Sequence, residues 1–351
     1  MKIEQVLKSA VEQNASDIFL VAGFPLSYKI NGVIVPQDDI KLKAIVTEDF
    51  SRKIFELRYG KDSKFDFNYQ LDFSFSMENV GRFRVNLFYQ RGSIAAVLRV
   101  VRFDILDYRE SGIVSEVMNL ASINVGLVIV TGTAGSGKST TLACIIDRIN
   151  HNYNKHIITI EDPIEYLHTH DRCIVSQREI ESDAQSYGSA LIAALREAPD
   201  VIQVGEMRDF ETIKTALSAV ETGHVVFSTL HTIGASDTIN RIIDVFPPDQ
   251  QHQIELQLAS SLKAVVSQKL IESVDGRLIP VFELLKVNKA IKTLIREGKS
   301  YQIDNYISGG RSEGMISLDN SLMELYYSGR ISKEVAINAA KDPLRMKGII
   351  N

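Results

Sequence analysis

A glycine-rich segment between a predicted strand and a predicted helix has the composition of a phosphate-binding loop. Residues 132–139 read Gly-Thr-Ala-Gly-Ser-Gly-Lys-Ser and match the whole pattern G-x4-G-K-[ST]. Glycines at 132, 135 and 137 let the backbone curl so that consecutive N–H groups face phosphate oxygens. The helix that follows adds its positive N-terminal end. We therefore predict that this loop binds the phosphates of a nucleotide.

The positions of this loop have distinct expected roles. Lys138 would bridge the terminal phosphates, and the Ser139 hydroxyl would take one position around Mg²⁺. The other predicted contacts with the nucleotide come from Gly132, Thr133, Ala134, Gly135, Ser136, Gly137 and Thr140. The alternative is a glycine-rich turn that holds no ligand. It is disfavoured because every position of the pattern matches and the segment stands in the correct strand-to-helix context.

Acidic residues end two other predicted strands and could supply the chemistry that a phosphate-binding loop lacks. Glu161 and Asp162 follow HIITI, and Glu206 follows VIQVG. Because the carboxyl ends of parallel strands share one edge of a sheet, both sets should face the loop. A carboxylate there can hold Mg²⁺ through water or orient an attacking water. The alternatives are helix capping before Pro163 for the first pair and a surface salt bridge with Arg208 for Glu206.

Two histidines flank the predicted strand VVFSTL, next to hydroxyl side chains. His231 follows the strand and stands beside Thr229 and Thr232, whereas His224 precedes it. An imidazole beside hydroxyls suits a sensor of the terminal phosphate of a nucleotide, and a structural role is the alternative. The pattern favours the sensor for His231 and leaves both interpretations open for His224.

The composition is that of a folded protein with no overall attraction to nucleic acid. The chain has 351 residues, of which 45% are apolar and 24% are charged, enough for two domains. It carries 39 basic and 44 acidic side chains, a formal net charge of -5, so no global positive field favours DNA or RNA. Apolar stretches such as 126–130 are far shorter than the roughly 20 residues of a membrane helix. The amphipathic start lacks the apolar core of a signal peptide, which points to the cytoplasm.

The first 103 residues predict a small α+β domain on an antiparallel sheet. Apolar residues at helical spacing predict a helix over residues 3–11, and Asn31-Gly32 predicts a hairpin turn. Strands are predicted at 17–22, 27–30, 33–35, 65–76, 82–89 and 93–102. In 65–76, aromatic and apolar residues alternate strictly with polar ones, which is typical of a half-buried strand. The aromatic stripe favours packing of a sheet on a helix over stacking of nucleic-acid bases.

In the rest of the chain, the spacing of apolar residues changes twice. Residues 104–115 have no clear period and are predicted to be a linker. From 116 to 284, short β-branched segments such as GLVIVTG and HVVFSTLH alternate with helical ones, which predicts a parallel sheet covered on both faces. Residues 285–351 return to helical spacing and predict a C-terminal helical region.

Six motifs, in this order, resemble those of the secretion ATPases and most closely those of the type IV pilus retraction ATPases of twitching motility, the PilT-like group. They are TGTAGSGKSTTLA (131–143), ITIEDPIEY (158–166), PDVIQVGEMRD (199–209), TGHVVFSTLHT (222–232), INRIIDVFP (239–247) and AIKTLIREG (290–298). Segments 16–34 and 81–88 also resemble the N-terminal domain of that family. The resemblance therefore covers nearly the whole chain.

This resemblance implies an α/β architecture, with a PAS-like α+β N-terminal domain, a RecA-like P-loop ATPase domain and a C-terminal helical appendage. It implies a ring of six identical subunits that binds ATP and Mg²⁺ between the two domains. Glu206 would activate the attacking water, and Glu161 and Asp162 would assist at Mg²⁺.

The resemblance also assigns a role to three arginines of the N-terminal domain. Arg82, Arg84 and Arg99 would reach the phosphates of the nucleotide when the domains close, because guanidinium groups pair well with phosphate. From the strand pattern alone, a cationic face on an exposed strand is the favoured interpretation. The two lines of reasoning therefore differ on these arginines.

The partners implied by the family are those of a pilus machine. The ring would work in the cytoplasm at the inner face of the membrane, on a pilus platform protein and through it on the pilin filament. A second pilus ATPase is a further possible partner, and no nucleic acid is expected. Assembly ATPases carry a four-cysteine zinc module, which Cys144 and Cys173 alone cannot form, so retraction is favoured.

Some residues depart from the family pattern and keep alternatives open. Thr133 replaces a proline of the loop, and Gln203 interrupts an otherwise apolar strand. Phe19 and the segment AGFP (22–25) resemble an accessory retraction ATPase, so the choice between principal and accessory motor stays open. The further alternatives are a secretion or DNA-uptake traffic ATPase and, from another class, a hexameric nucleic-acid motor, which the acidic charge balance disfavours.

Overall fold

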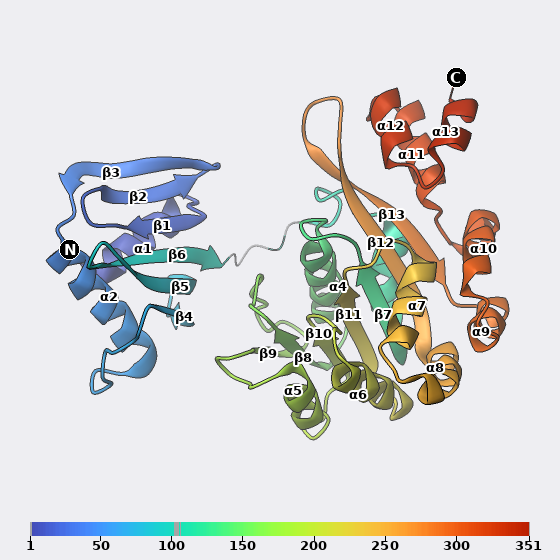
Figure 1. Ribbon diagram of the computed structural model, residues 1–351, viewed down its shortest axis with the longest axis horizontal. Helices are drawn as coiled ribbons and strands as arrows, with labels where there is room; N and C mark the ends of the chain where they lie inside the picture. Colours follow the sequence, from blue (N-terminus) through green and yellow to red (C-terminus); the bar gives the residue numbers. More distant parts are fainter. Residues whose placement is uncertain (1, 102–104, 106, 351) are drawn as a thin grey trace. The chain divides into compact units, whose positions relative to one another are not determined.

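The computed structural model describes residues 2–101, 105 and 107–350. The chain forms two compact units, one made mainly of residues up to 104 and the other mainly of residues from 105 (Figure 1). The predicted linker 104–115 and the end of the predicted strand 93–102 include positions 102–104 and 106, which lie outside the described residues. Ile105, Tyr108 and Ile113 pack against the apolar core of the second unit.

The N-terminal unit is an antiparallel sheet with two helices on one face. Its elements are α1 (Ile3–Glu12), β1 (Asp17–Leu20), β2 (Pro25–Ile30), β3 (Val33–Lys41), α2 (Ala44–Tyr59), β4 (Gln70–Met77), β5 (Gly81–Gln90) and β6 (Ser93–Val101). The strands lie in the order β3-β2-β1-β6-β5-β4. Leu7 of α1 and Ile54 of α2 pack against Ile18, Val85 and Leu98 of the strands. The helix, the hairpin and the α+β sheet expected from the sequence are confirmed.

The hairpin between β2 and β3 depends on two residues that tolerate positive φ. Asn31 has φ 52° and Gly32 has φ 82°, the combination that a two-residue turn of this hand requires. The turn sets the register Ile30 opposite Val33. Sequence reasoning found this turn but missed the length of β3 and the whole of α2.

The predicted strand over residues 65–76 is wrong in its first part. β4 begins only at Gln70, which pairs with Phe88 of β5, and β5 ends at Gln90. Residues 65–68 therefore have no partner strand in the described part of the chain. Phe65 instead packs on Phe55 of α2 with ring centroids 5.3 Å apart. The alternation of aromatic and polar residues therefore begins before Gln70, the first residue of β4 that has a partner on β5.

The C-terminal unit is built on a mainly parallel sheet of seven strands. The sheet strands are β7 (Gly126–Thr131), β8 (His156–Glu161), β9 (Ile174–Glu179), β10 (Val201–Val204), β11 (Val225–Leu230), β12 (Leu262–Glu272) and β13 (Leu278–Lys286). They lie in the order β13-β12-β7-β11-β10-β8-β9, and only β13 pairs antiparallel with its neighbour. The expected parallel α/β sheet is thus confirmed, with an antiparallel edge strand that sequence reasoning did not predict.

Helices cover both faces of this sheet, as a sheet of fully buried strands requires. One face is covered by α3 (Ser115–Met118), η1 (Asn119–Ser122) and α4 (Lys138–Asn152). The other is covered by α5 (Tyr187–Ala194), α6 (Phe210–Glu221), α7 (Ala235–Asp244) and α8 (Pro248–Ser261). Every residue of β7 and of β11 is buried. These two strands therefore form the rigid centre from which the neighbouring loops project.

The last part of the chain is helical, as expected. Its elements are α9 (Lys289–Arg296), η2 (Ser300–Gln302), α10 (Ile303–Gly309), η3 (Gly310–Glu313), α11 (Leu318–Tyr327), α12 (Lys333–Ala339) and α13 (Pro343–Ile349). Apolar residues of α9 and α10 join the large core around the sheet. Those of α11, α12 and α13 form a small core of their own against the β12–β13 hairpin (Figure 1).

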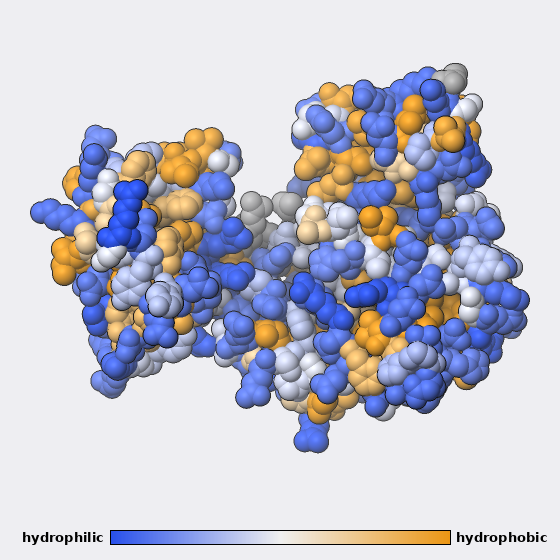
Figure 2. Space-filling view, viewed as in Figure 1, coloured by the Kyte–Doolittle hydropathy of each residue, from blue (hydrophilic) through white to orange (hydrophobic). Residues whose placement is uncertain are grey.

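On the face that Figure 2 shows, the surface of each unit is mostly hydrophilic and is interrupted by smaller apolar areas. Within the described part of the chain, no helix has both the length and the apolar composition needed to cross a membrane. The thiols of Cys144 and Cys173 are both buried.

Candidate active site

The glycine-rich loop connects the end of β7 to the start of α4, at the centre of the sheet. Gly132 has φ 149° and Gly137, the residue that caps α4, has φ 88°. Neither has room for a side chain. A Cβ on Gly132 would overlap the backbone oxygen of Gln268, and one on Gly137 would lie 2.8 Å from the Gln268 carboxamide nitrogen. The glycines are therefore required both by the backbone conformation and by close packing against β12.

Lys138 and Ser136 are buried at this loop and fit an anion. The Lys138 ammonium donates to the carbonyl oxygens of Gly132 and Thr133, each at 2.9 Å. The Ser136 hydroxyl is buried and has no hydrogen-bond partner among the described residues. A buried hydroxyl without a partner is unusual and marks this loop as a candidate ligand site. The residues present thus fit the phosphates of a nucleotide.

Gln268 of β12 packs against the glycine-rich loop, and sequence reasoning missed it. Its side chain is 3% exposed, and its oxygen accepts a hydrogen bond of 2.7 Å from the Thr141 hydroxyl of α4. Its nitrogen lies under Gly137. A single carboxamide therefore fixes the first turn of α4 and the end of the loop together. No motif indicates this role, because Gln268 lies more than 120 residues after the loop in the sequence.

The acidic candidates meet the loop at one edge of the sheet. Val204 of β10 is in register with Ile160 of β8 and Ser228 of β11, and Leu230 of β11 with Thr131 of β7. The carboxyl ends of these strands therefore lie together, as predicted. Glu161 ends β8 and Glu206 follows β10 by two residues. The edge thus brings the phosphate-binding loop and the candidate carboxylates onto the same side of the sheet.

Each glutamate at this edge is held by neighbouring side chains. Glu161 accepts hydrogen bonds from the Thr159 hydroxyl at 2.6 Å and from the Gln177 amide at 3.1 Å. Oε2 of Glu206 lies 2.6 Å from Arg208 Nε and 3.3 Å from His231 Nε2. The salt bridge with Arg208 that served as the alternative for Glu206 is therefore present. It does not remove Glu206 from the site, because that carboxylate is only 16% exposed and also contacts His231.

Tyr187, at the start of α5, is a further group that sequence reasoning did not find. A Cβ on Gly205, the residue before Glu206, would lie 2.8 Å from the Tyr187 hydroxyl. Burial raises the pKa of Tyr187, and the charges of Glu206, Asp162 and Glu161 raise it further. The phenol therefore stays protonated at neutral pH and is a hydrogen-bond donor beside the carboxylates.

The two histidines are separated by the full length of β11. His231 follows the carboxyl end, where its Nε2 lies 3.3 Å from Glu206. His224 lies at the amino end, where its Nδ1 contacts the carbonyl oxygen of Ala219 at 2.9 Å. Seven residue steps separate them, about 23 Å at the usual rise of a strand. Of the two roles left open for His224, the phosphate sensor does not fit this position. Within one chain it lies at the wrong edge of the sheet.

The three arginines lie on the polar face of the N-terminal sheet, opposite the helices. Arg84 of β5 is directly opposite Arg99 of β6, and Arg99 is opposite Asp17 of β1. Nε of Arg99 donates to Asp17 at 3.1 Å, and Arg82 donates to the Ser76 hydroxyl at 3.3 Å. The cationic face that the strand pattern favoured is present. A role at phosphates stays a prediction.

These features define a class of protein. A parallel α/β sheet that carries a glycine-rich loop, a buried lysine and a cluster of carboxylates at one edge is a P-loop nucleotide-hydrolysing domain.

Comparisons with known proteins place the chain within that class. A model of the Type II/IV secretion system protein family matches residues 1–278. The type IV pilus retractation ATPase PilT of Pseudomonas aeruginosa is 42% identical over 98% of this chain and 99% of its own length. The type IV pilus ATPase PilU of the same organism is 38% identical over 96% and 88%. A crystal structure of the pilus retraction motor PilT with bound ADP has a TM-score of 0.88 and 45% identity over 99% of both chains.

The chain therefore belongs to the Type II/IV secretion system protein family, and it is a P-loop ATPase. The resemblance to the secretion ATPases that six motifs indicated is confirmed.

The support of the loop by Gln268 gives a test. Gln268→Ala leaves the Thr141 hydroxyl buried without its acceptor and opens space under Gly137. We expect the free energy of unfolding to fall by about 1–3 kcal/mol and ADP to bind more weakly, because the loop loses its rigid base. Thermal unfolding and titration with a fluorescent ADP analogue measure the two effects. Gln253→Ala, at an exposed position of α8, is the control and should change neither. ADP affinity equal to that of the wild type would contradict this role.

Proposed function

We propose that this chain is the subunit of a hexameric ATPase motor that powers retraction of type IV pili. The observation that carries the proposal is similarity from end to end with a retraction ATPase, in both sequence and fold. It is joined by an intact loop, lysine and carboxylate set at one edge of the sheet. The ring would act in the cytoplasm at the inner face of the membrane, on a pilus platform protein and through it on the pilin filament.

In this proposal, each group at the edge has one task. The backbone N–H groups of the loop and the Lys138 ammonium bind the phosphates of ATP. The Ser139 hydroxyl and the carboxylates of Glu161 and Asp162 would hold Mg²⁺, which supplies positive charge against the phosphate oxygens. Glu206 accepts the proton of the attacking water at its carboxylate, and Arg208 and His231 keep that carboxylate in place. His231 also stands where it can respond to the terminal phosphate.

The direct test is the phenotype of a strain that lacks the gene. Loss of a retraction motor should leave more pili on the surface and abolish twitching motility. Absence of pili would indicate an assembly ATPase instead, and normal pili with a secretion or DNA-uptake defect would indicate a traffic ATPase. Hexamers in light scattering support the ring, whereas monomers with and without an ATP analogue would contradict it.

An accessory retraction ATPase is the second candidate, and one residue favours it. Phe19 on β1 is partly exposed and lies on the same face of the sheet as Arg84 and Arg99. An accessory ATPase depends on a principal motor. If pilus retraction persists at a reduced level in the deletion strain, the accessory role is favoured.

The assignment of Glu206 as the base predicts that binding and hydrolysis separate. Glu206→Gln keeps the shape of the side chain and an oxygen for Arg208 but removes the base. We expect turnover to fall by about 10²-fold or more with little change in ATP affinity. Lys138→Ala should instead lower both, because it removes a charge-assisted contact with the phosphates. A phosphate-release assay and nucleotide titration measure them, with Glu221→Gln at the opposite edge as the control. Equal losses of affinity and turnover in Glu206→Gln would assign that residue a structural role.

The face of the N-terminal sheet that carries Arg82, Arg84 and Arg99 gives a prediction in which activity falls but stability does not. Like charges directly opposite each other in a sheet are unfavourable, so replacing Arg84, opposite Arg99, should not lower the melting temperature. If the face binds phosphates across a domain closure, turnover should nevertheless fall by about 10³-fold on the scale of an arginine finger. We expect this for Arg82→Ala/Arg84→Ala, with Lys53→Ala on α2 as a matched control from the helical side. Unchanged turnover in the double variant would return these arginines to a solvated surface.

A further inference from the structure

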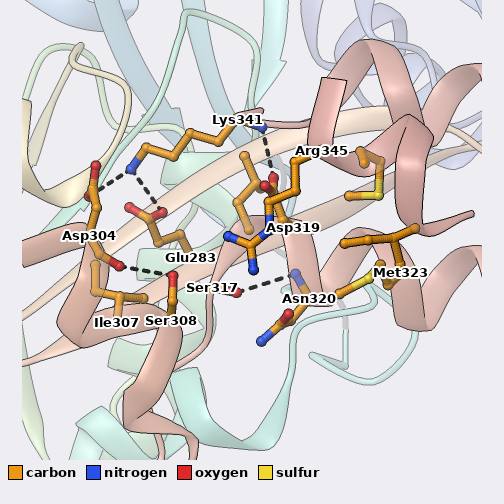
Figure 3. A pocket seen from close by; sticks show the side chains of 13 residues that line it. Glu283, Asp304, Ile307, Ser308, Ser317, Asp319, Asn320, Met323, Lys341 and Arg345 are labelled. Atoms are coloured by element: carbon orange, nitrogen blue, oxygen red, sulfur yellow. Dashed lines mark hydrogen bonds and ion pairs between the residues drawn. The ribbon is translucent and has the colours of Figure 1, made fainter. Parts of the chain in front are cut away.

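A buried carboxylate links the C-terminal helices to the P-loop ATPase core. Glu283 of β13 is 4% exposed. Its Oε2 lies 3.4 Å from Nζ of Lys341, which follows α12, and the same ammonium lies 2.7 Å from Asp304 Oδ1 of α10. Figure 3 shows the Lys341 ammonium between the two carboxylates. Three segments of the last 70 residues thus meet at one charged group.

The other oxygen of Glu283 holds the beginning of α7. Oε1 accepts a hydrogen bond of 3.0 Å from the N–H of Ala235, the first residue of α7. Ser267, directly opposite Glu283 on β12, accepts one of 3.0 Å from the N–H of Gly234. The first N–H groups of a helix have no partner within the helix, and a carboxylate at this end is favourable. Glu283 therefore fixes where α7 starts.

The residues just before α7 are those of the active site. His231 contacts Glu206, and the next residue, Thr232, accepts a hydrogen bond of 2.6 Å at its carbonyl oxygen from the Thr131 hydroxyl at the end of β7. Only Ile233 and Gly234 separate this pair from Ala235. A displacement of the start of α7 must therefore change the position of His231 or break its neighbour's contact with β7.

We propose that Lys341 is a positioning residue for ATP hydrolysis, which acts through Glu283 and the start of α7 on His231. The proposal rests on the proposed ATP turnover at this P-loop. The ammonium lies beside the buried carboxylate and holds it where it accepts the hydrogen bond from Ala235. Docking of the C-terminal helices is thereby a condition for the active arrangement of His231 and Glu206.

The electrostatics support a fixed charge pair. Burial lowers the pKa of Lys341, but the carboxylates of Glu283 and Asp304 outweigh burial and leave the pKa above its ordinary value. The ammonium is therefore charged at neutral pH. Without it, the buried Glu283 side chain would have no cation beside it, a situation that proteins relieve by movement of the side chain. Such a movement weakens the hold on α7.

The test compares two lysines that bind the same part of the C-terminal helices. Lys341→Ala removes the partner of Glu283. Lys269→Ala removes an ammonium that donates to the carbonyl oxygen of Ala339 at 3.2 Å but does not touch Glu283. We expect kcat for ATP to fall about tenfold or more in Lys341→Ala with KM within about twofold of the wild type, because the phosphate-binding loop is unchanged. In Lys269→Ala, kcat should stay within about twofold of the wild type. The change in melting temperature should be similar to that of Lys341→Ala.

A second substitution separates charge balance from packing. Glu283→Gln keeps an oxygen for the Ala235 N–H but no longer needs a cation, so Glu283→Gln/Lys341→Ala should recover most of the lost kcat relative to Lys341→Ala alone. Hydrogen exchange at Gly234 and Ala235 gives a readout that does not depend on activity. It should be faster in Lys341→Ala and close to wild type in the double variant.

The outcomes against the proposal are distinct from failure of the proposed function. Wild-type protein without ATP turnover would contradict the function, and hydrogen exchange would still show whether Lys341 holds the start of α7 through Glu283. Unchanged exchange at Gly234 and Ala235 in Lys341→Ala would overturn it, and so would an equal loss of kcat in Lys269→Ala. Additive losses in the double variant would also overturn it, because Lys341 would then not act through the charge of Glu283.

Discussion

The path of the backbone between β7 and α4 is the constraint on which the rest of this structure depends. A loop that offers consecutive N–H groups to phosphates has to turn within a few residues, and at Gly132 and Gly137 it does so against the buried strand β12. Gln268 fills the space that side chains at these positions would need. The arrangement works only if β12 lies beside β7 in a fixed register, which the parallel pairing of the two strands provides.

Parallel strands also explain how much of the site could be predicted from the sequence. Once GLVIVTG, HIITIED, VIQVGE and HVVFSTLH are identified as parallel strands, the residues that follow them must share an edge. The positions of Glu161, Glu206 and His231 beside the loop could therefore be predicted from strand order and polarity alone. The same rule, applied strictly, would have placed His224 at the opposite edge, because it precedes its strand.

The remaining site residues could not be predicted because their roles come from tertiary packing. Gln268 and Glu283 stand in β12 (LKAVVSQKLIE) and β13 (LIPVFELLK), where polar residues are scattered among apolar ones without a pattern that marks which of them faces the loop or α7. Tyr187 is one aromatic residue at the start of a helix, and only the close packing of its hydroxyl on Gly205 brings it to the carboxylates. In the N-terminal unit, the aromatic alternation from Phe65 to Phe75 was correct for one face of β4 but carried no information on where β5 stops pairing.

The segment from His231 to Ala235 is fastened on two sides, which matters for the proposed conversion of ATP hydrolysis into movement. Thr131 holds it to the strand that ends in the phosphate-binding loop, and Ser267 and Glu283 hold it to the hairpin against which the last helices pack. Packed elements of this kind shift between discrete arrangements rather than deform continuously. A change at the phosphates that moves His231 therefore acts on the start of α7, and a load on the C-terminal helices acts on the same point from the other side. By thermodynamic linkage, if nucleotide binding at the loop changes binding of a partner at the C-terminal helices, then that partner changes nucleotide binding by the same factor.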